Sequence, residues 1–312
     1  MLMQEANQNN RSVDYMRSIG GIIPAVVTAY DDNGRLSKKN LEVLYSHLIR
    51  NGVDGLFVGG STGEWPLLSS DERKLEARIA LDVAGTAVPV IMHVSSLLID
   101  EIKQYVSWAE NNGISAISLV MPYYFSYRDD GIIDFFKSAL SECSLPVLIY
   151  NIPGNVKNVL TPSLMHKISD SIDCVVGVKD SSMDYLKLQE FMSERCSKKL
   201  MFFTGNDAQI IPALFAGANG AVSAAAGAFP AFVKRMHQCY LDGNTEKAME
   251  MQQSLLRYRQ FVVSNPPMSV VKEALNLQGL NVGIPRLPLS PLPTDKIKTL
   301  EGIIKEEGLL DE

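Results

Sequence analysis

The sequence lacks the short motifs with which proteins usually build disulfide frameworks and metal sites. No CxxC pair and no HxxxH or HExxH pair occurs among its four cysteines and four histidines; the cysteines are Cys143, Cys174, Cys196 and Cys239. Cysteines scattered in this way are typical of small core residues in a reducing compartment. We therefore expect a cytoplasmic protein without a bound metal ion, and no residue pattern indicates another cofactor.

Long apolar runs and basic clusters are also absent. No apolar run approaches the roughly 20 residues of a membrane-spanning helix. Residues 1–18 are polar and contain no signal-peptide core, so we expect a loosely ordered extension there. The net charge is -6 without a long basic run, which argues against binding to nucleic acid or an anionic membrane. A content of 46% hydrophobic and 21% charged residues is ordinary for a soluble globular protein.

What the sequence does contain is a regular alternation of short apolar runs and longer amphipathic stretches. Near-continuous apolarity is typical of strands buried on both faces of a parallel sheet. Eight such runs occupy residues 21–29, 55–60, 88–94, 116–121, 146–151, 174–178, 199–204 and 220–225. A helix-like stretch follows each run, at residues 37–51, 69–84, 98–112, 129–143, 161–168, 184–194, 207–216 and 229–242.

Eight strand–helix units predict a (β/α)8 barrel, or TIM barrel, over residues 19–242. A capping-box pattern supports the start of the predicted helix at 69–84, because Glu72 lies three residues after the N-cap candidate Ser69. A doubly wound open sheet is the competing α/β fold, and the count of eight units argues against it. Residues 243–312 show no strand pattern and predict three helices, at 245–265, 268–277 and 295–307. We expect this helical region to pack on the barrel and to contribute an oligomer surface.

The sixth predicted strand ends in a lysine. Alternation along this valine-rich run places Val175, Gly177 and Lys179 on one face. Burial disfavours the charged form of an amine, so a lysine buried there would lose its proton more easily and act as a nucleophile. The alternative is that the strand ends at Gly177 and that Lys179 is a solvated loop residue.

Functional groups of such a barrel lie at the C-terminal ends of its strands and in the loops that follow. After the second strand, Ser61 and Thr62 offer two hydroxyls and open backbone N–H groups, which suit a carboxylate. A plain glycine turn with a capping hydroxyl would explain the same residues. Tyr150 ends the fifth strand, either as a proton relay or as a buried tyrosine with a satisfied hydroxyl.

The other strand ends are less specific. Tyr123, Tyr124 and Phe125 follow the fourth strand and could be a simple aromatic cluster. Asp207 follows the seventh strand and is either a helix cap or a site carboxylate, and the small residues after Val222 leave room for a substrate. An amine, a tyrosine and a Ser-Thr pair around one cavity favour Schiff-base chemistry on a 2-oxo acid. In that chemistry the amine attacks the ketone, and the iminium accepts the electrons of the neighbouring C–C bond.

Three motifs resemble the pyruvate-dependent class I aldolases of the dihydrodipicolinate synthase/N-acetylneuraminate lyase family. They are GGSTGE at 59–64, YNIPG at 150–154 and GVKDSS at 177–182, in family-typical order and spacing. The resemblance covers residues from about 20 to about 300 and implies a (β/α)8 barrel with C-terminal helices, usually assembled as a homotetramer.

The resemblance also implies roles for individual residues. Lys179 would be the Schiff-base lysine, and Tyr150 would be the proton-transfer tyrosine. Ser61 and Thr62 would bind the pyruvyl carboxylate, whereas Gly205 and Val222 would line the pocket. Tyr124 matches a tyrosine that family members often insert into a neighbouring subunit's site, where it joins a relay with Ser61 and Tyr150.

Departures from the family pattern bear on the substrate. Dihydrodipicolinate synthases carry a carboxylate-binding arginine five residues after the site tyrosine, and here that position is Asn155, with Lys157 as the nearby cation. Sialic acid lyases usually carry an Asp-Glu pair after the seventh strand and a serine after the eighth, where this chain has Asp207, Ala208 and Ala224. These departures weaken both assignments.

We therefore expect reversible cleavage of a 2-keto-3-deoxy sugar acid, or a similar hydroxylated 2-oxo acid, to pyruvate and an aldehyde. Its hydroxyls would contact Asn155, Asn206, Asp207 and Ser181. Other possibilities are condensation of pyruvate with aspartate semialdehyde, with Lys157 supplying a carboxylate contact, N-acetylneuraminate cleavage and sugar-acid dehydration. A ligand-binding barrel without catalysis is the alternative from a different functional class.

Overall fold

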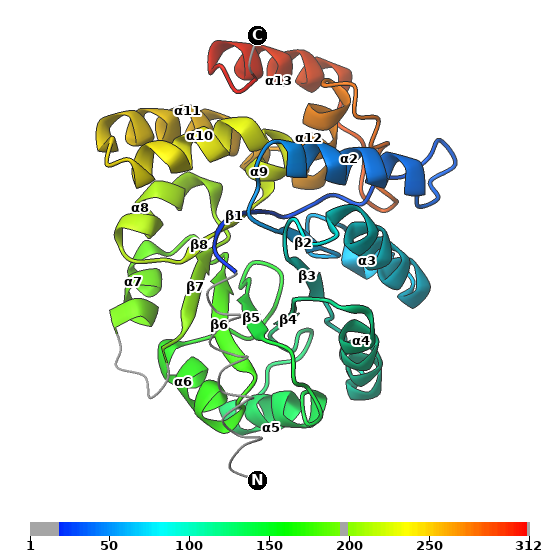
Figure 1. Ribbon diagram of the computed structural model, residues 1–312, viewed down its shortest axis with the longest axis vertical. Helices are drawn as coiled ribbons and strands as arrows, with labels where there is room; N and C mark the ends of the chain where they lie inside the picture. Colours follow the sequence, from blue (N-terminus) through cyan, green and yellow to red (C-terminus); the bar gives the residue numbers. More distant parts are fainter. Residues whose placement is uncertain (1–18, 194–198, 311–312) are drawn as a thin grey trace.

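The protein is a barrel of eight parallel strands surrounded by helices, in a computed structural model that describes residues 19–193 and 199–310 (Figure 1). The strands are hydrogen-bonded in the order β1-β8-β7-β6-β5-β4-β3-β2. A bridge between Ala25 and Phe57 joins the two ends of this series, with Val26 donating to the Phe57 carbonyl at 3.1 Å. The predicted (β/α)8 barrel is confirmed. The predicted N-terminal extension and Cys196 lie outside the described residues.

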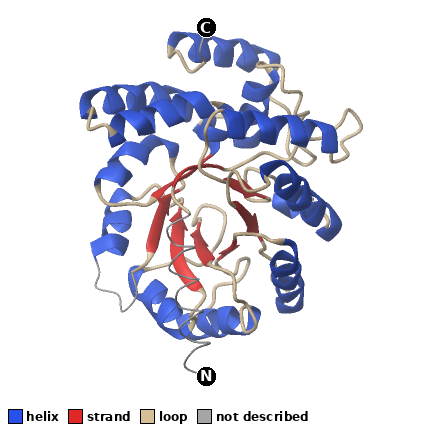
Figure 2. Ribbon diagram, viewed as in Figure 1, coloured by secondary structure: helices blue, strands red, loops and turns tan. Residues whose placement is uncertain are grey.

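The eight strands fall at the predicted apolar runs, and their ring is visible at the centre of Figure 2. They are β1 (Gly21–Pro24), β2 (Leu56–Val58), β3 (Val90–His93), β4 (Ala116–Val120), β5 (Val147–Asn151), β6 (Val175–Asp180), β7 (Met201–Thr204) and β8 (Gly220–Ser223). Seven of them lie inside the predicted ranges. The sixth continues beyond its range to Asp180, so the alternative in which this strand ends at Gly177 is wrong.

The helices that follow the strands begin and end close to the predicted positions. They are α2 (Lys38–Arg50), α3 (Ser70–Ala84), α4 (Ile99–Asn112), α5 (Asp129–Ala139), α6 (Pro162–Ser171), α7 (Tyr185–Ser193), α8 (Ile210–Phe215) and α10 (Pro230–Leu241). Two 3-10 turns accompany them, η1 (Trp65–Leu67) and η2 (Asp207–Gln209). The predicted capping box is present, because Ser69 and Glu72 each accept from the other's backbone N–H.

One further helix was not expected. The segment α9 (Ala224–Ala228) begins directly after β8. Its small apolar residues extended the predicted strand to residue 225 because composition alone does not distinguish them from a buried strand. The Ser223 side chain, which accepts from the Ala226 N–H, ends the strand and starts the helix.

The C-terminal region forms the three predicted helices, α11 (Thr245–Val263), α12 (Pro267–Asn276) and α13 (Thr294–Glu306). They lie at one edge of the barrel, beside α10 and α2 (Figure 1). Their buried residues, including Leu255 and Val270, belong to the same apolar cluster as the outer faces of the strands. Within the described residues, no helix is long and apolar enough to span a bilayer.

An extra residue interrupts the alternation of β6. Val147 pairs with Val175, but Leu148 pairs with Gly177, which leaves Val176 as the additional residue of a bulge. Val176 packs in the barrel interior, whereas Val175 joins the apolar cluster between sheet and helices. The prediction that Val175 shares a face with Lys179 is therefore wrong.

Candidate active site

Lys179 lies at the C-terminal end of β6 with 4% of its surface exposed. Its Nζ is 4.0 Å from the centre of the Tyr150 ring and 4.2 Å from that of Phe57. Burial lowers the pKa of this amine, and Tyr150 and Asp207 partly oppose the shift. The neutral, nucleophilic amine is therefore more populated than in an exposed lysine at the same pH.

Two glycines allow close packing around this lysine. A Cβ on Gly177, within β6, would collide with the carbonyl of Met201 on β7. A Cβ on Gly205, just after β7, would collide with the Ser181 hydroxyl and would press on Cε of Lys179 at 3.2 Å. Glycine at 177 therefore lets β6 pair closely with β7, and glycine at 205 leaves space for the Lys179 side chain.

Tyr150, on β5, pairs with Lys179 in the sheet register and is 3% exposed. Its ring meets those of Phe57 and His93 edge-on, with centres 6.3 and 5.9 Å away. Burial lowers the pKa of His93 well below its ordinary value, so this imidazole is neutral. The amine and the phenol thus meet in a largely aromatic environment.

Ser61 and Thr62 form the turn that follows β2. The turn is closed by the Glu64 N–H, which donates to the Ser61 carbonyl at 3.1 Å, and by the Trp65 N–H, which donates to the Gly60 carbonyl at 3.3 Å. Both side chains are partly exposed. Within the described part of the chain, neither hydroxyl is bonded to another protein group, so both are available to a ligand.

A cavity of about 400 Å³ opens beside this turn. Its walls are mainly apolar and come from the β2, β4 and β5 loops and the C-terminal region: Ser61, Glu64, Trp65, Pro66, Leu67, Val120, Tyr123, Ile152, Asn155, Val156, Met268, Pro288 and Leu289. The cavity has the size of an ordinary small-molecule site. Ser61 and Asn155 line it, whereas Lys179, Tyr150 and Thr62 are not among its lining residues.

Asp207 and Asn206 are engaged in hydrogen bonds inside the protein. The Asp207 carboxylate accepts from the Ser223 hydroxyl at 2.6 Å and from the Ala225 N–H at 3.2 Å. Burial raises the pKa of this carboxyl. Asp207 is thus a helix cap, but of α9 rather than of the helix that follows it in sequence. The Asn206 side-chain oxygen accepts from the Ala208 N–H at 3.2 Å and from Arg259 at 3.4 Å.

The other predicted pocket residues lie nearby. Val222 is buried in the barrel interior, and partly exposed Ser181 lies against Gly205. Asn155 and Lys157 both lie on the exposed loop after β5. The predicted residues of β2, β5, β6, β7 and β8 are therefore grouped at the C-terminal end of the barrel.

Tyr124 occupies a different position. It is 74% exposed and has a left-handed backbone (φ 73). The centre of its ring lies 4.8 Å from that of the Phe125 ring. The structure thus places it on the surface of this chain, not beside the buried Tyr150.

The loop that carries Tyr124 is held by Asn158, a residue that sequence reasoning missed. The buried Asn158 amide donates to the carbonyls of Pro122 at 2.7 Å and Phe125 at 2.8 Å, and accepts from the Tyr127 N–H at 2.9 Å. No local pattern predicts these contacts, because they join loops that follow two different strands.

Comparison with known proteins agrees with this architecture. The model of the dihydrodipicolinate synthetase family matches residues 18–307, so the chain belongs to that family. Its members are pyruvate-dependent class I aldolases and lyases that form a Schiff base, and the predicted enzyme class is confirmed.

Among the relatives, 4-hydroxy-tetrahydrodipicolinate synthase of Bacillus subtilis is 32% identical over 93% of this chain and 99% of its own. The enzyme of the same name from Listeria innocua is 33% identical over 93% of this chain and 99% of its own. Among solved structures, dihydrodipicolinate synthase from Thermotoga maritima has a TM-score of 0.89 at 28% identity, and the match covers 94% of this chain and 100% of that one. A prophage protein of this family from E. coli K12, in complex with pyruvate, has a TM-score of 0.88 at 30% identity, covering 94% and 99%.

Proposed function

We propose that this chain cleaves a hydroxylated 2-oxo acid, of the 2-keto-3-deoxy sugar acid type, reversibly to pyruvate and an aldehyde. The observation that carries the proposal is the buried amine of Lys179 beside the Tyr150 ring. The neutral amine adds to the ketone and water leaves, which forms an iminium bonded to Lys179. Cleavage sends the electrons of the C–C bond into this iminium and gives an enamine. Protonation and hydrolysis then release pyruvate and restore the amine.

The neighbouring groups support this sequence of steps. Tyr150 lies beside the amine, and it would relay the proton of the substrate hydroxyl as the aldehyde forms, accepting that proton while its own phenolic proton passes on to solvent. The available hydroxyls of Ser61 and Thr62 would bind the pyruvyl carboxylate. Gly205 and Val222 would leave space for the three-carbon unit at the end of the barrel.

The distal part of the substrate would meet Asn155. A neutral amide hydrogen-bonds a hydroxyl, but it lacks the charged, bidentate fork with which arginine binds a carboxylate. Because the oxygens of Asn206 and Asp207 already accept protein hydrogen bonds, direct contact with hydroxyls would fall mainly to Asn155 and Ser181. This favours a substrate whose distal end is neutral.

Condensation of pyruvate with aspartate semialdehyde is the second candidate. The relatives at 32% and 33% identity named above are 4-hydroxy-tetrahydrodipicolinate synthases, which favours this reaction. Lys157 could supply the carboxylate contact if the loop after β5 moved.

A direct comparison of kcat/KM separates the two candidates. We expect kcat/KM for cleavage of 2-keto-3-deoxygluconate-type acids, measured by the pyruvate released, to exceed kcat/KM for condensation of pyruvate with aspartate semialdehyde. Asn155→Arg should shift the ratio toward condensation by about tenfold or more, because it adds a charge-assisted contact. Condensation faster than every cleavage reaction in the unsubstituted protein would overturn the assignment.

We further propose that the active form is a homotetramer in the cytoplasm. The exposed Tyr124 would reach the Ser61 and Tyr150 hydroxyls of a second copy. Among the described residues, Cys143, Cys174 and Cys239 form no disulfide, which suits a reducing compartment. Sedimentation that showed a fully active monomer would refute the tetramer.

A further inference from the structure

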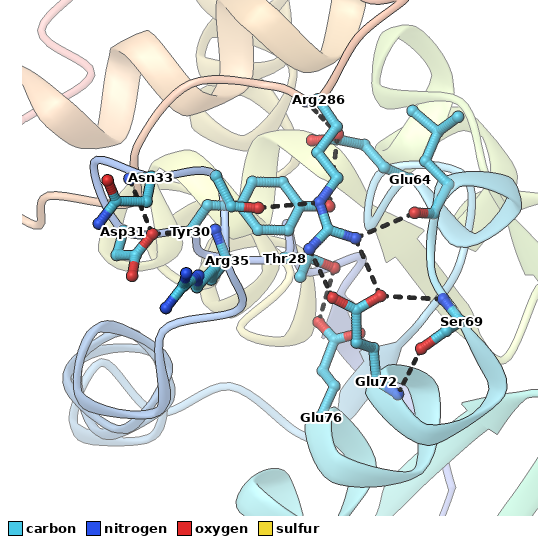
Figure 3. Close-up of polar contacts among 12 residues, drawn as sticks. Thr28, Tyr30, Asp31, Asn33, Arg35, Glu64, Ser69, Glu72, Glu76 and Arg286 are labelled. Atoms are coloured by element: carbon cyan, nitrogen blue, oxygen red, sulfur yellow. Dashed lines mark hydrogen bonds and ion pairs between the residues drawn. The ribbon is translucent and has the colours of Figure 1, made fainter.

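Glu64, which follows the turn that carries Ser61 and Thr62, is held by residues of the C-terminal region, and Figure 3 shows Arg286 beside it. The Glu64 carboxylate is buried, and its Oε1 lies 2.6 Å from Nζ of Lys272, on α12. Its Oε2 accepts from the backbone N–H of Arg286 at 2.9 Å. The Lys272 side chain is 1% exposed, so this ion pair is fully removed from solvent.

The anchored residue has a constrained backbone. Glu64 adopts a left-handed conformation, with φ 58 and ψ 32, which is unfavourable for a residue with a side chain. Its N–H donates to the Ser61 carbonyl and its carbonyl accepts from the Leu67 N–H at 2.8 Å. The N–H thus closes the Ser61 turn and the carbonyl closes η1, so Glu64 joins the two, and a shift of its backbone would displace Ser61 and Thr62.

The surrounding contacts oppose such a shift. Nζ of Lys272 also donates to the Ile284 carbonyl at 3.2 Å and lies 4.0 Å from the centre of the Tyr30 ring. The Arg286 guanidinium binds the Glu72 carboxylate and donates to the Leu67 carbonyl at 3.0 Å (Figure 3). The C-terminal region thus contacts both ends of η1, directly beside the turn.

We propose that Glu64 and Lys272 are positioning residues for substrate-carboxylate binding. Their buried ion pair ties α12 to the turn and holds the Ser61 and Thr62 hydroxyls toward the carboxylate. This inference rests on the proposed role of Ser61 and Thr62, and it gives the C-terminal helices a part in substrate affinity in addition to packing.

The test separates affinity from stability with Lys272→Met and the double variant Glu64→Gln/Lys272→Met. Removing Lys272 alone leaves a buried, unpaired carboxylate, so that variant should lose both thermal stability and pyruvate affinity. The double variant has no lone buried charge and should regain much of the lost stability. Its half-saturating pyruvate concentration, measured by borohydride trapping, should still be about tenfold higher, with the trapped amount at saturation unchanged.

Lys234→Met is the matched control, because it removes the part-buried ion pair of Lys234 with Asp54. Asp54 precedes β2, whereas the Ser61 turn follows the C-terminal end of this strand. This control variant should leave half-saturation within about twofold of the parent value. If the double variant recovers stability and affinity together, or matches Lys234→Met in affinity, this inference is overturned and the proposed function is unaffected. A parent protein that traps no pyruvate would overturn the proposed function and this inference with it.

Discussion

Glu76→Gln should change how the stability of this protein depends on pH. Glu76 lies on α3, fully buried below the Ser61 turn. Its Oε1 is 2.9 Å from the Thr28 hydroxyl, which also lies 2.6 Å from the Gly63 carbonyl. A hydroxyl has one proton to donate. Thr28 can therefore donate to Gly63 while bonding Glu76 only if the carboxyl is protonated and donates to Thr28.

The size of the effect follows from the pKa of Glu76. Burial raises this pKa from 4.5 to about 7. The unfolded chain therefore releases this proton first as the pH rises, and the folded state loses stability between about pH 4.5 and about pH 7. A shift of this size corresponds to about 3 kcal/mol. Glutamine does not titrate, so the stability of Glu76→Gln relative to the parent should rise by about that amount across this interval.

Urea unfolding of both proteins at several pH values between about 4 and about 8 measures this difference. Glu72→Gln is the control. Arg286 lowers the pKa of Glu72 to about 2, so its contribution is lost only as the pH falls below its ordinary value of 4.5. The Glu72→Gln difference should consequently be flat above about pH 5. A flat difference for Glu76→Gln as well would refute the account of a protonated carboxyl under the turn.

The remaining predictions concern the site and its loops. Tyr150→Phe should lower kcat by about 10²–10⁴-fold, the range for lost acid–base catalysis, and steady-state kinetics with a near-normal kcat would contradict the relay. Asn158→Ala removes three hydrogen bonds and should lower the free energy of unfolding by about 2–4 kcal/mol; urea unfolding checks this, and a loss no larger than that of Asn155→Ala would contradict it. Gly205→Ala should reduce trapping of pyruvate, because the new Cβ would press on Lys179; an unchanged yield of reduced adduct would show that the site relaxes freely.

Short-range patterns predict most of this fold. A capping box such as Ser69 and Glu72 depends on residues three positions apart, so sequence alone locates the start of α3. The bulge at Val176 could not be predicted in this way, because its register depends on how β6 pairs with β5. The start of α9 likewise depends on Asp207, whose carboxylate accepts from the Ala225 N–H of this helix.

The sequence likewise predicts the residues of the candidate site that lie at strand ends, but not their long-range partners. Lys179 and Tyr150 end strands that are neighbours in the barrel, so position along each strand is enough to bring them together. The partners of Glu64 are different, because Arg286 is 222 residues away in sequence and Lys272 lies on α12. Such contacts require the packed C-terminal region, and no local motif contains them.

Borohydride reduction in the presence of pyruvate, followed by mass spectrometry, tests the central claim most directly. The account predicts one reduced pyruvyl group per chain, located on Lys179. It also predicts that Lys179→Arg abolishes the labelling, because a guanidinium stays charged and is a poor nucleophile. Labelling of another lysine, or no labelling of the unsubstituted protein, would contradict the proposed chemistry.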